Sequence, residues 1–418
     1  MPSVFLLTLG CPKNEADSDS FAGCFSAAGW EIADNSEKAD LLLLNTCAFI
    51  QPAVEESLEA IAEAVEWKNC KTGRKLILAG CLPGRFRNDD SGGLEDFDLI
   101  TGPGDNAALM KYLSASVSAG PVPVESIYHR YLKISEGCSN NCSYCTIPLI
   151  RGHREDRSFE DILQDAGHLA EQGALEIGIV GQDTGSWRSS RGGVSQLVSH
   201  LALTFPHIWF RLYYIHPAHF PDEFPVLIEK YPNIMPYIDM PIQHVSDTVL
   251  ERMGRPYTEE YLRNMFESFD KSDMELAVRT TVIVGYPGET DTDFDRLIGF
   301  LSDYDCLRTI SAFPYWPEEG TREYSRKAAA DLPGPDTVQS RLMGIGDVSD
   351  QLYMVRAERI EGKVIEVLAD TAELGHGRLD APVVDGACIF DRVVEPGQII
   401  KCRVSECFGS EMLVEVLQ

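Results

Sequence analysis

The order of apolar and polar positions predicts alternating strands and helices in the first part of the chain. Short apolar runs at Val4–Leu9, Leu41–Leu44 and Leu76–Ala79 are typical of buried strands. The stretch Ser57–Val65, between two of these runs, has the apolar spacing of a helix. Strands that alternate with helices favour a parallel sheet, because parallel neighbours need a long crossover connection. We therefore expect an N-terminal α/β domain with a parallel sheet over residues 1–125.

The central part of the chain repeats a strand-then-helix pattern. Its strand candidates are apolar runs separated by polar, helix-compatible segments: Tyr131–Ser135, Glu176–Val180, Trp209–Ile215, Tyr237–Met240, Val278–Val284 and Thr309–Phe313. Such units in ~200 residues predict a partial, TIM-like (βα)6 barrel of parallel strands, which we assign to residues 126–355. A doubly wound open sheet is the competing interpretation of the same pattern.

The last part of the chain is rich in short β-forming runs and has no helical periodicity. After a helical stretch at Leu342–Arg359, these runs follow one another with glycines between them: Lys363–Val367, Ala387–Phe390, Ile399–Val404 and Met412–Val416. This pattern predicts a small antiparallel β-barrel over residues 356–418. The whole chain is therefore expected to be an α/β protein with three domains.

Composition and charge narrow the location and the partner. Apolar runs such as Leu41–Leu44 are far shorter than the ~18 residues of a membrane span, and we expect no signal peptide, because no basic, apolar and small-residue series is present. We therefore expect a cytoplasmic protein with no membrane partner. The net charge of −29 divides as −10, −14 and −5 over the three expected domains. An evenly acidic protein favours a basic partner and repels nucleic acid, although solubility alone would explain the same charge.

The strongest chemical signal is the central trio of cysteines, Cys138, Cys142 and Cys145. Their spacing fits a loop folded around one metal centre. Structural zinc takes four protein ligands, whereas three thiolates on a four-iron cluster leave one iron open to a substrate or cofactor. The loop follows the first strand of the expected barrel, at the face where barrel active sites form. A zinc site with a distant fourth ligand is the alternative.

A second, dispersed group is the N-terminal trio of Cys11, Cys47 and Cys81. Each of these cysteines stands at or just beyond the end of a predicted strand in the first domain. The carboxyl ends of parallel strands share one edge of a sheet, so the three sulfurs are able to converge there. From the sequence alone, three buried structural cysteines explain the pattern as well as a second cluster does.

The central trio and the aromatic Tyr144 resemble the signature of radical S-adenosylmethionine (SAM) enzymes. With the N-terminal trio included, the chain is similar to the methylthiotransferases of that superfamily over essentially its whole length. The resemblance implies SAM and two [4Fe-4S] clusters as cofactors, one cluster on the N-terminal trio and the other, which binds SAM, on the central trio. It also implies that the C-terminal barrel is an OB-like TRAM domain that grips the substrate.

Further segments resemble the branch of this family that modifies a ribosomal protein. They are Gly10–Asn14 followed by Asp17–Asp19, and Asp380–Gly386 in the last domain. The resemblance implies a transferase that inserts a methylthio group at the β-carbon of an aspartate. The target it implies is ribosomal protein S-twelve, a basic protein of the small subunit, either free or within the subunit. An electron donor such as flavodoxin or ferredoxin is implied as a second partner.

Polar residues on the expected barrel strands are candidates for SAM binding. Family-like segments lie along the second and fifth of these strands, and we expect Gln182, Asp183 and Arg279 to lie near SAM. An ordinary hydrogen bond at a strand end is the alternative for each of them. His244, which ends another strand segment, is either an acid–base group or a core histidine.

Two other functions remain open from the sequence. A tRNA adenosine methylthiotransferase would carry the same clusters, and a basic stripe at Arg151, Arg154 and Arg157 would then contact RNA phosphates. A non-enzymatic iron–sulfur carrier or a zinc-stabilised scaffold would also use the cysteines. The acidity of all three expected domains favours a basic protein substrate over nucleic acid.

Overall fold

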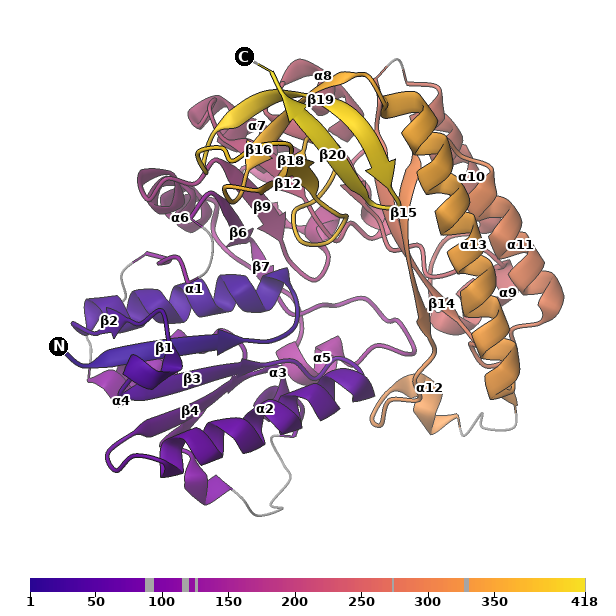
Figure 1. Ribbon diagram of the computed structural model, residues 1–418. Helices are drawn as coiled ribbons and strands as arrows, with labels where there is room; N and C mark the ends of the chain where they lie inside the picture. Colours follow the sequence, from indigo (N-terminus) through magenta and orange to yellow (C-terminus); the bar gives the residue numbers. More distant parts are fainter. Residues whose placement is uncertain (87–93, 115–119, 125–126, 273, 327–330, 418) are drawn as a thin grey trace.

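The computed structural model describes residues 1–86, 94–114, 120–124, 127–272, 274–326 and 331–417. Within them the chain forms a five-stranded sheet, a six-stranded sheet and a closed five-stranded barrel, with helices around them (Figure 1). The predicted α/β class is confirmed. The expected boundary between residues 125 and 126 lies outside the described residues.

The N-terminal sheet is parallel, with the strand order β2-β1-β3-β4-β5. Its strands are β1 (Ser3–Thr8), β2 (Glu31–Ile32), β3 (Leu41–Thr46), β4 (Lys75–Gly80) and β5 (Leu99–Ile100). The three apolar runs predicted as strands correspond to β1, β3 and β4. The edge strands β2 and β5 cannot be predicted from the hydrophobic pattern, because two residues are too few to show a period.

Helices cover both faces of the N-terminal sheet. α1 (Pro12–Ala27) lies on the face towards the central strands and α2 (Gln51–Asn69) lies on the opposite face (Figure 1). The shorter helices of this part are η1 (Ser36–Lys38), α3 (Cys81–Arg85), η2 (Leu94–Asp96) and α4 (Asn106–Leu113). The predicted helix lies inside α2. The hydrophobic pattern does not predict α1, because its buried side chains include Asn14, Asp17 and Asp19.

The central six-stranded sheet is parallel, with the strand order β15-β14-β13-β12-β9-β6. Its strands are β6 (His129–Lys133), β9 (Glu176–Val180), β12 (Trp209–Leu212), β13 (Ile234–Asp239), β14 (Ala277–Val284) and β15 (Leu307–Pro314). Neighbours in this sheet follow one another along the chain, so it lacks the reversal of strand order that defines a doubly wound sheet. The prediction of a partial (βα)6 barrel is confirmed.

The remaining helices lie in the central part of the chain. They are α5 (Ile147–Arg151), α6 (Phe159–Glu171), α7 (Val194–Thr204), α8 (Phe224–Lys230), α9 (Asp247–Met253), α10 (Glu259–Asp270), α11 (Asp291–Ser302), α12 (Arg322–Ser325) and α13 (Pro335–Ile360), with η3 (Thr184–Ser186) and η4 (Pro217–His219). Short ladders are β7 (Ser135–Glu136) with β8 (Glu155–Asp156), and β10 (Arg188–Ser189) with β11 (Gly192–Gly193). No helix in the described part of the chain is both long and apolar enough to cross a membrane.

The C-terminal residues close into a barrel in the order β16-β17-β18-β20-β19. Its strands are β16 (Val364–Ala369), β17 (Leu374–Gly377), β18 (Cys388–Phe390), β19 (Ile399–Phe408) and β20 (Glu411–Val416). The small barrel is therefore confirmed. Its seams are antiparallel except between β18 and β20, which pair in parallel. The pattern does not predict β17, whose four residues include two glycines and a histidine.

A buried ion cluster fastens the C-terminal barrel to the central sheet. Arg211 of β12 pairs with both carboxylate oxygens of Glu176, the first residue of β9, at 2.8 and 3.2 Å. The same carboxylate also contacts His376 Nε2 of β17, at 3.0 Å, and Nδ1 of the same ring lies 2.7 Å from Asp370. The C-terminal barrel thus covers the amino-terminal ends of central strands and leaves the opposite ends to the N-terminal sheet.

Candidate active site

The N-terminal trio lies at the carboxyl ends of three adjacent parallel strands. Cys11 follows β1 and caps α1, Cys47 directly follows β3, and Cys81 begins α3 directly after β4. Burial, and then the neighbouring Cys11 thiol, raise the pKa of Cys47 to about 11. Burial also raises the pKa of Cys81, with a smaller contribution from Cys11. The structure therefore brings the three thiols together, as the strand-end argument expects.

Glycines allow the backbone to come close beside these thiols. Gly10 has a φ of +103°, and a side chain there would place its Cβ 2.8 Å from Cys47 Cβ. Gly80 has a φ of +96°, and its Cβ would come within 2.5 Å of the Thr46 carbonyl oxygen. Any larger residue at these two positions would have to push the strand ends apart, in addition to adopting a left-handed backbone.

The central trio lies in the loop between β7 and α5. The Cys138 amide donates to the Gly152 carbonyl at 3.1 Å, which closes the base of the loop. Ser143 fixes its middle, because its amide donates to the Met253 carbonyl at 2.8 Å and its hydroxyl lies 2.6 Å from Tyr286 Oη. Burial, and then the Cys142 thiol, raise the pKa of Cys145 to about 12. Main-chain bonds therefore hold the loop in place.

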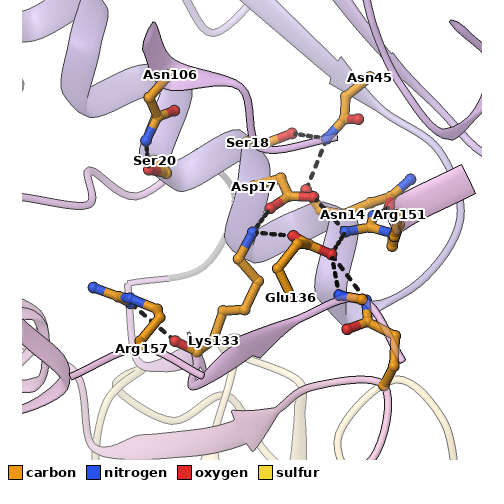
Figure 2. A network of polar contacts seen from close by, with 12 residues as sticks. Asn14, Asp17, Ser18, Ser20, Asn45, Asn106, Lys133, Glu136, Arg151 and Arg157 are labelled. Carbon is orange, nitrogen blue, oxygen red and sulfur yellow. Dashed lines mark hydrogen bonds and ion pairs between the residues drawn. The ribbon is translucent and has the colours of Figure 1, made fainter. Parts of the chain in front are cut away.

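A buried ion network (Figure 2) lies between the N-terminal trio and the segment that leads into the central trio. Arg151 of α5 donates to Asp17 of α1 at 3.1 Å and to Glu136 of β7 at 2.9 Å. Lys133 of β6 pairs with the same two carboxylates. Burial alone would raise the pKa of Glu136, but the charges of Lys133 and Arg151 outweigh it and lower that pKa to about 2. Two cations therefore balance two carboxylates where the N-terminal sheet meets the central strands.

Arg151 also reaches the N-terminal trio itself. Its Nη2 donates to Asn14 Oδ1 at 2.6 Å and lies 3.5 Å from Cys81 Sγ. The Asn14 amide nitrogen donates to the carbonyls of Leu9 and Thr46, at 2.7 and 3.0 Å, and so ties together the chain segments that follow β1 and β3. One arginine from the central loop region thus contacts both a thiol and the residue that organises the strand ends.

The three residues predicted to lie near SAM take different places. Gln182 donates to Glu136 at 3.1 Å, so it belongs to the ion network. Asp183 accepts from Asn140 of the cysteine loop at 2.7 Å and contacts His219 Nδ1 at 2.6 Å. Arg279 of β14 lies 3.2 Å from Asp385, in the segment before β18, and also contacts Asp239 and Ser311. The structure brings Asp183 to the loop of the central trio and Gln182 to the ion network beside it.

His244 occupies the position of a core histidine. Its side chain is fully buried, its Nδ1 accepts from the Ser246 amide at 3.0 Å, and its Nε2 lies 3.6 Å from Glu289. Nδ1 is therefore hydrogen-bonded within the loops that follow β13 and β14, whereas Nε2 has no hydrogen-bond partner among the described residues. The full burial of the side chain favours the structural interpretation of this residue over an acid–base role.

Three residues near the trios carry no signal in the hydrophobic pattern. Tyr214, just after β12, has a φ of +57°, which is a strained conformation for a non-glycine residue. The Tyr214 amide donates to Asp239 at 3.2 Å, and the Lys13 ammonium lies 3.4 Å from the centroid of the Tyr214 ring. Lys13 stands within a segment that the family resemblance singles out, but its contact with the barrel strands needs the fold to become visible.

The donor atoms of both trios fit an iron–sulfur cluster better than a single ion. Among the described residues, no three His, Cys, Asp or Glu side chains converge closely enough to hold one metal ion. Within each trio the thiols are still near enough to influence one another's pKa. A four-iron cluster takes one thiolate on each of several irons, so it suits sulfur donors that are grouped more widely than a single zinc ion requires.

Known protein families match the two parts of the chain that carry the N-terminal trio and the central trio. The model of the uncharacterized protein family UPF0004 matches residues 3–102, and that of the radical SAM superfamily matches residues 132–301. The ribosomal protein uS12 methylthiotransferase RimO of Syntrophus aciditrophicus is 34% identical, over 99% of this chain and 98% of the relative. Proteins of the same name from Myxococcus xanthus and Carboxydothermus hydrogenoformans are 33% and 32% identical, over 92% and 96% of their own lengths.

Solved structures share the fold at low sequence identity. The radical SAM methyltransferase TsrM from Kitasatospora setae, with tryptophan substrate and a SAM analog bound, aligns with a TM-score of 0.54 over 74% of this chain and 73% of that chain, at 14% identity. TsrM with cobalamin and a [4Fe-4S] cluster bound gives a TM-score of 0.56 over 77% of each chain, at 15% identity. At these identities the likeness concerns the fold alone.

Proposed function

Because the chain belongs to the family of ribosomal protein uS12 methylthiotransferases, a group of radical SAM transferases, we propose that it attaches a methylthio group to the β-carbon of an aspartate of uS12. The chemistry of this family uses SAM and [4Fe-4S] clusters. The observation that carries the proposal for this chain is the placement of two cysteine trios on either side of one buried ion network.

We assign the cluster that binds SAM to Cys138, Cys142 and Cys145, and the second cluster to the N-terminal trio. When bound, these groups and SAM supply the radical, the sulfur and the methyl group that an unactivated carbon requires. The protein's own part is to bring both cofactors to one substrate carbon and to exclude water. The loop after β7 and the carboxyl ends of β1, β3 and β4 face each other for that purpose.

Arg151 is the positioning residue between the two trios. It neutralises Asp17 and Glu136, and its Nη2 holds the Asn14 side chain and lies beside Cys81. Its side chain is almost fully buried, so these charge-assisted contacts are strong and leave little freedom of orientation. The distance between the two trios is therefore set by a rigid ion network.

Three domains divide the work in this proposal. Residues 1–125 carry the N-terminal trio, residues 126–355 carry the central trio with Gln182 and Asp183 near SAM, and residues 356–418 form a TRAM-type barrel that grips uS12. Arg279, which also contacts Asp385 of the last domain, belongs with Gln182 and Asp183 in the proposed SAM-binding set. We further propose a cytoplasmic location, and flavodoxin or ferredoxin as the electron donor.

The charges of the described residues support a basic protein substrate over tRNA. The arginines of the possible RNA-binding stripe each lie within reach of a carboxylate: Arg151 with Asp17, Arg154 with Asp156 at 3.3 Å, and Arg157 with Asp165 at 2.7 Å. An arginine paired in this way offers little free charge to a phosphate. The overall charge of −29 works in the same direction.

Mass spectrometry of uS12 tests the proposed function. The reconstituted enzyme, given SAM, a sulfur source and a reductant, is expected to add one methylthio group in place of a hydrogen on a single aspartate. Incubation with tRNA in place of uS12 is expected to give no methylthio product. A product on tRNA together with unmodified uS12 would overturn the proposal.

Iron analysis tests the ligand assignment separately. The wild type is expected to bind about eight iron atoms, and Cys142→Ala or Cys47→Ala about four, because each variant loses one cluster. Only Cys142→Ala is expected to lose SAM cleavage. The matched control is Cys70→Ala, because Cys70 is an exposed thiol at the end of α2. Wild-type iron in both trio variants would refute the assignment.

A further inference from the structure

Lys13 is a cation beside the N-terminal trio that has no carboxylate partner among the described residues. It stands in the first turn of α1, two residues after Cys11, and its side chain is half-buried. The cations nearby are all paired: Arg130 with Asp19, Lys133 with Asp17 and Arg151 with Asp17. Among the described residues, no carboxylate oxygen lies within 4.0 Å of the Lys13 ammonium. The chain has 65 acidic and 36 basic side chains, so an unpaired, half-buried ammonium needs an explanation.

The position of this ammonium is defined by the strands on both sides. It lies 3.4 Å from the centroid of the Tyr214 ring, just after β12. The Tyr214 amide in turn donates to Asp239 at the end of β13. The positive charge lowers the pKa of both Cys47 and Asp239, against the larger effect of their burial. Lys13 therefore lies between the N-terminal trio and the carboxyl ends of central strands, where the substrate carbon has to be placed.

We propose that Lys13 binds the side-chain carboxylate of the substrate aspartate and so selects aspartate over its uncharged isostere. The proposal rests on the function proposed above and adds the substrate contact to it. The contact with the Tyr214 ring keeps the ammonium in place and leaves hydrogen-bond donors available, because a cation–π contact uses the face of the ring rather than an acceptor atom. A carboxylate would add charge-assisted hydrogen bonds to that arrangement.

Two other roles for Lys13 make different predictions. SAM also has a carboxylate. If Lys13 bound that carboxylate instead, Lys13→Met would weaken SAM binding whatever the substrate. As a counter-ion to Asp239 alone, Lys13 would affect aspartate-containing and asparagine-containing substrates equally. Only recognition of the substrate carboxylate links the effect of Lys13 to the charge of the substrate residue.

The test is a double-mutant cycle measured by binding. We compare uS12 with uS12 in which the modified aspartate is replaced by asparagine, using calorimetry on the cluster-loaded full chain. Wild-type enzyme is expected to bind the aspartate form about 10- to 100-fold more tightly, because a hydrogen-bonded charge is lost in the other form. In Lys13→Met this preference is expected to disappear, and Lys13→Arg is expected to retain part of it.

The controls separate the outcomes. Lys75→Met removes another lysine that lies over a tyrosine ring, Tyr112, on the N-terminal sheet and is expected to bind as the wild type does. A Lys13→Met protein that keeps the aspartate preference, or loses affinity for SAM instead, would overturn the inference. Equal weakening of both uS12 forms by Lys13→Met would also overturn it. If wild-type enzyme methylthiolates no uS12, the proposed function fails first, and that result is seen without any Lys13 variant.

Discussion

The attachment of the C-terminal barrel should weaken as the pH rises through the pKa of His376. The side chain of His376 is 1% exposed and lies between Glu176 and Asp370. Burial alone would lower the pKa of this histidine, but the Glu176 charge and the hydrogen bonds to both carboxylates outweigh it and raise the pKa to about 9. His376 is therefore charged in the folded protein at neutral pH.

The size and the direction of the effect follow from the two pKa values. An unfolded histidine titrates near 6.5, so a folded pKa of about 9 corresponds to about 3 kcal/mol of stabilisation. Because the folded value is the higher one, this contribution is complete below about pH 6.5 and is lost as the pH rises towards about 9. Between about pH 6 and about pH 8.5 we expect a loss of about 2 kcal/mol.

Hydrogen exchange measures this loss in β16 and β17. The free energy of opening is obtained at both pH values for the wild type and for His376→Gln, and the difference between the two proteins cancels the titration of all other groups. Glutamine retains hydrogen-bonding capacity without the charge. The difference is expected to shrink by about 2 kcal/mol at the higher pH. A difference that stays the same at both pH values would refute the charged His376.

Three further perturbations test the site and the surface. Gly10→Ala should push Cys47 away and halve the bound iron, with SAM cleavage retained; full iron content would contradict the close approach. Arg151→Met should lower the free energy of unfolding by about 3 kcal/mol, because the Asp17 carboxylate stays buried and loses a partner. The lost ion pair with Glu136 contributes less to this energy, because Glu136 is partly exposed to solvent. A loss below about 1 kcal/mol, measured by urea unfolding, would contradict a stabilising role of these buried ion pairs. Binding of uS12 should weaken at least about tenfold from low to high salt, because salt screens the attraction between an acidic protein and a basic partner. Salt-independent binding would contradict recognition of uS12 by charge.

The strands could be predicted from the sequence because their burial is apolar. The runs that became β3 and β4 are buried on both faces, so they form continuous apolar stretches that need no knowledge of the fold. α1 could not be predicted in the same way. Its buried Asn14, Asp17 and Asp19 contact partners more than a hundred residues away in the sequence. A hydrophobic pattern records only the local spacing of apolar residues, so it cannot predict such polar pairs.

The same distinction applies to the site. The spacing of the central trio and the strand-end positions of the N-terminal trio are visible in the sequence, because each depends on local chain geometry. The contact of Arg151 with Cys81 and the place of Lys13 against Tyr214 depend on how two sheets meet. The contact of Arg279 with Asp385 likewise involves a segment that only the fold brings close.

The ion network also bears on the order in which the chain can mature during synthesis. Asp17 leaves the ribosome 134 residues ahead of Arg151 and 116 residues ahead of Lys133. The parallel sheet around β1, β3 and β4 is complete in sequence before either partner emerges, so the carboxylates of α1 face water while it forms. The cysteines at its edge therefore remain reachable from solution in the nascent chain. They become enclosed when the loop after β7 arrives, which makes enclosure of the N-terminal trio a late event in biogenesis.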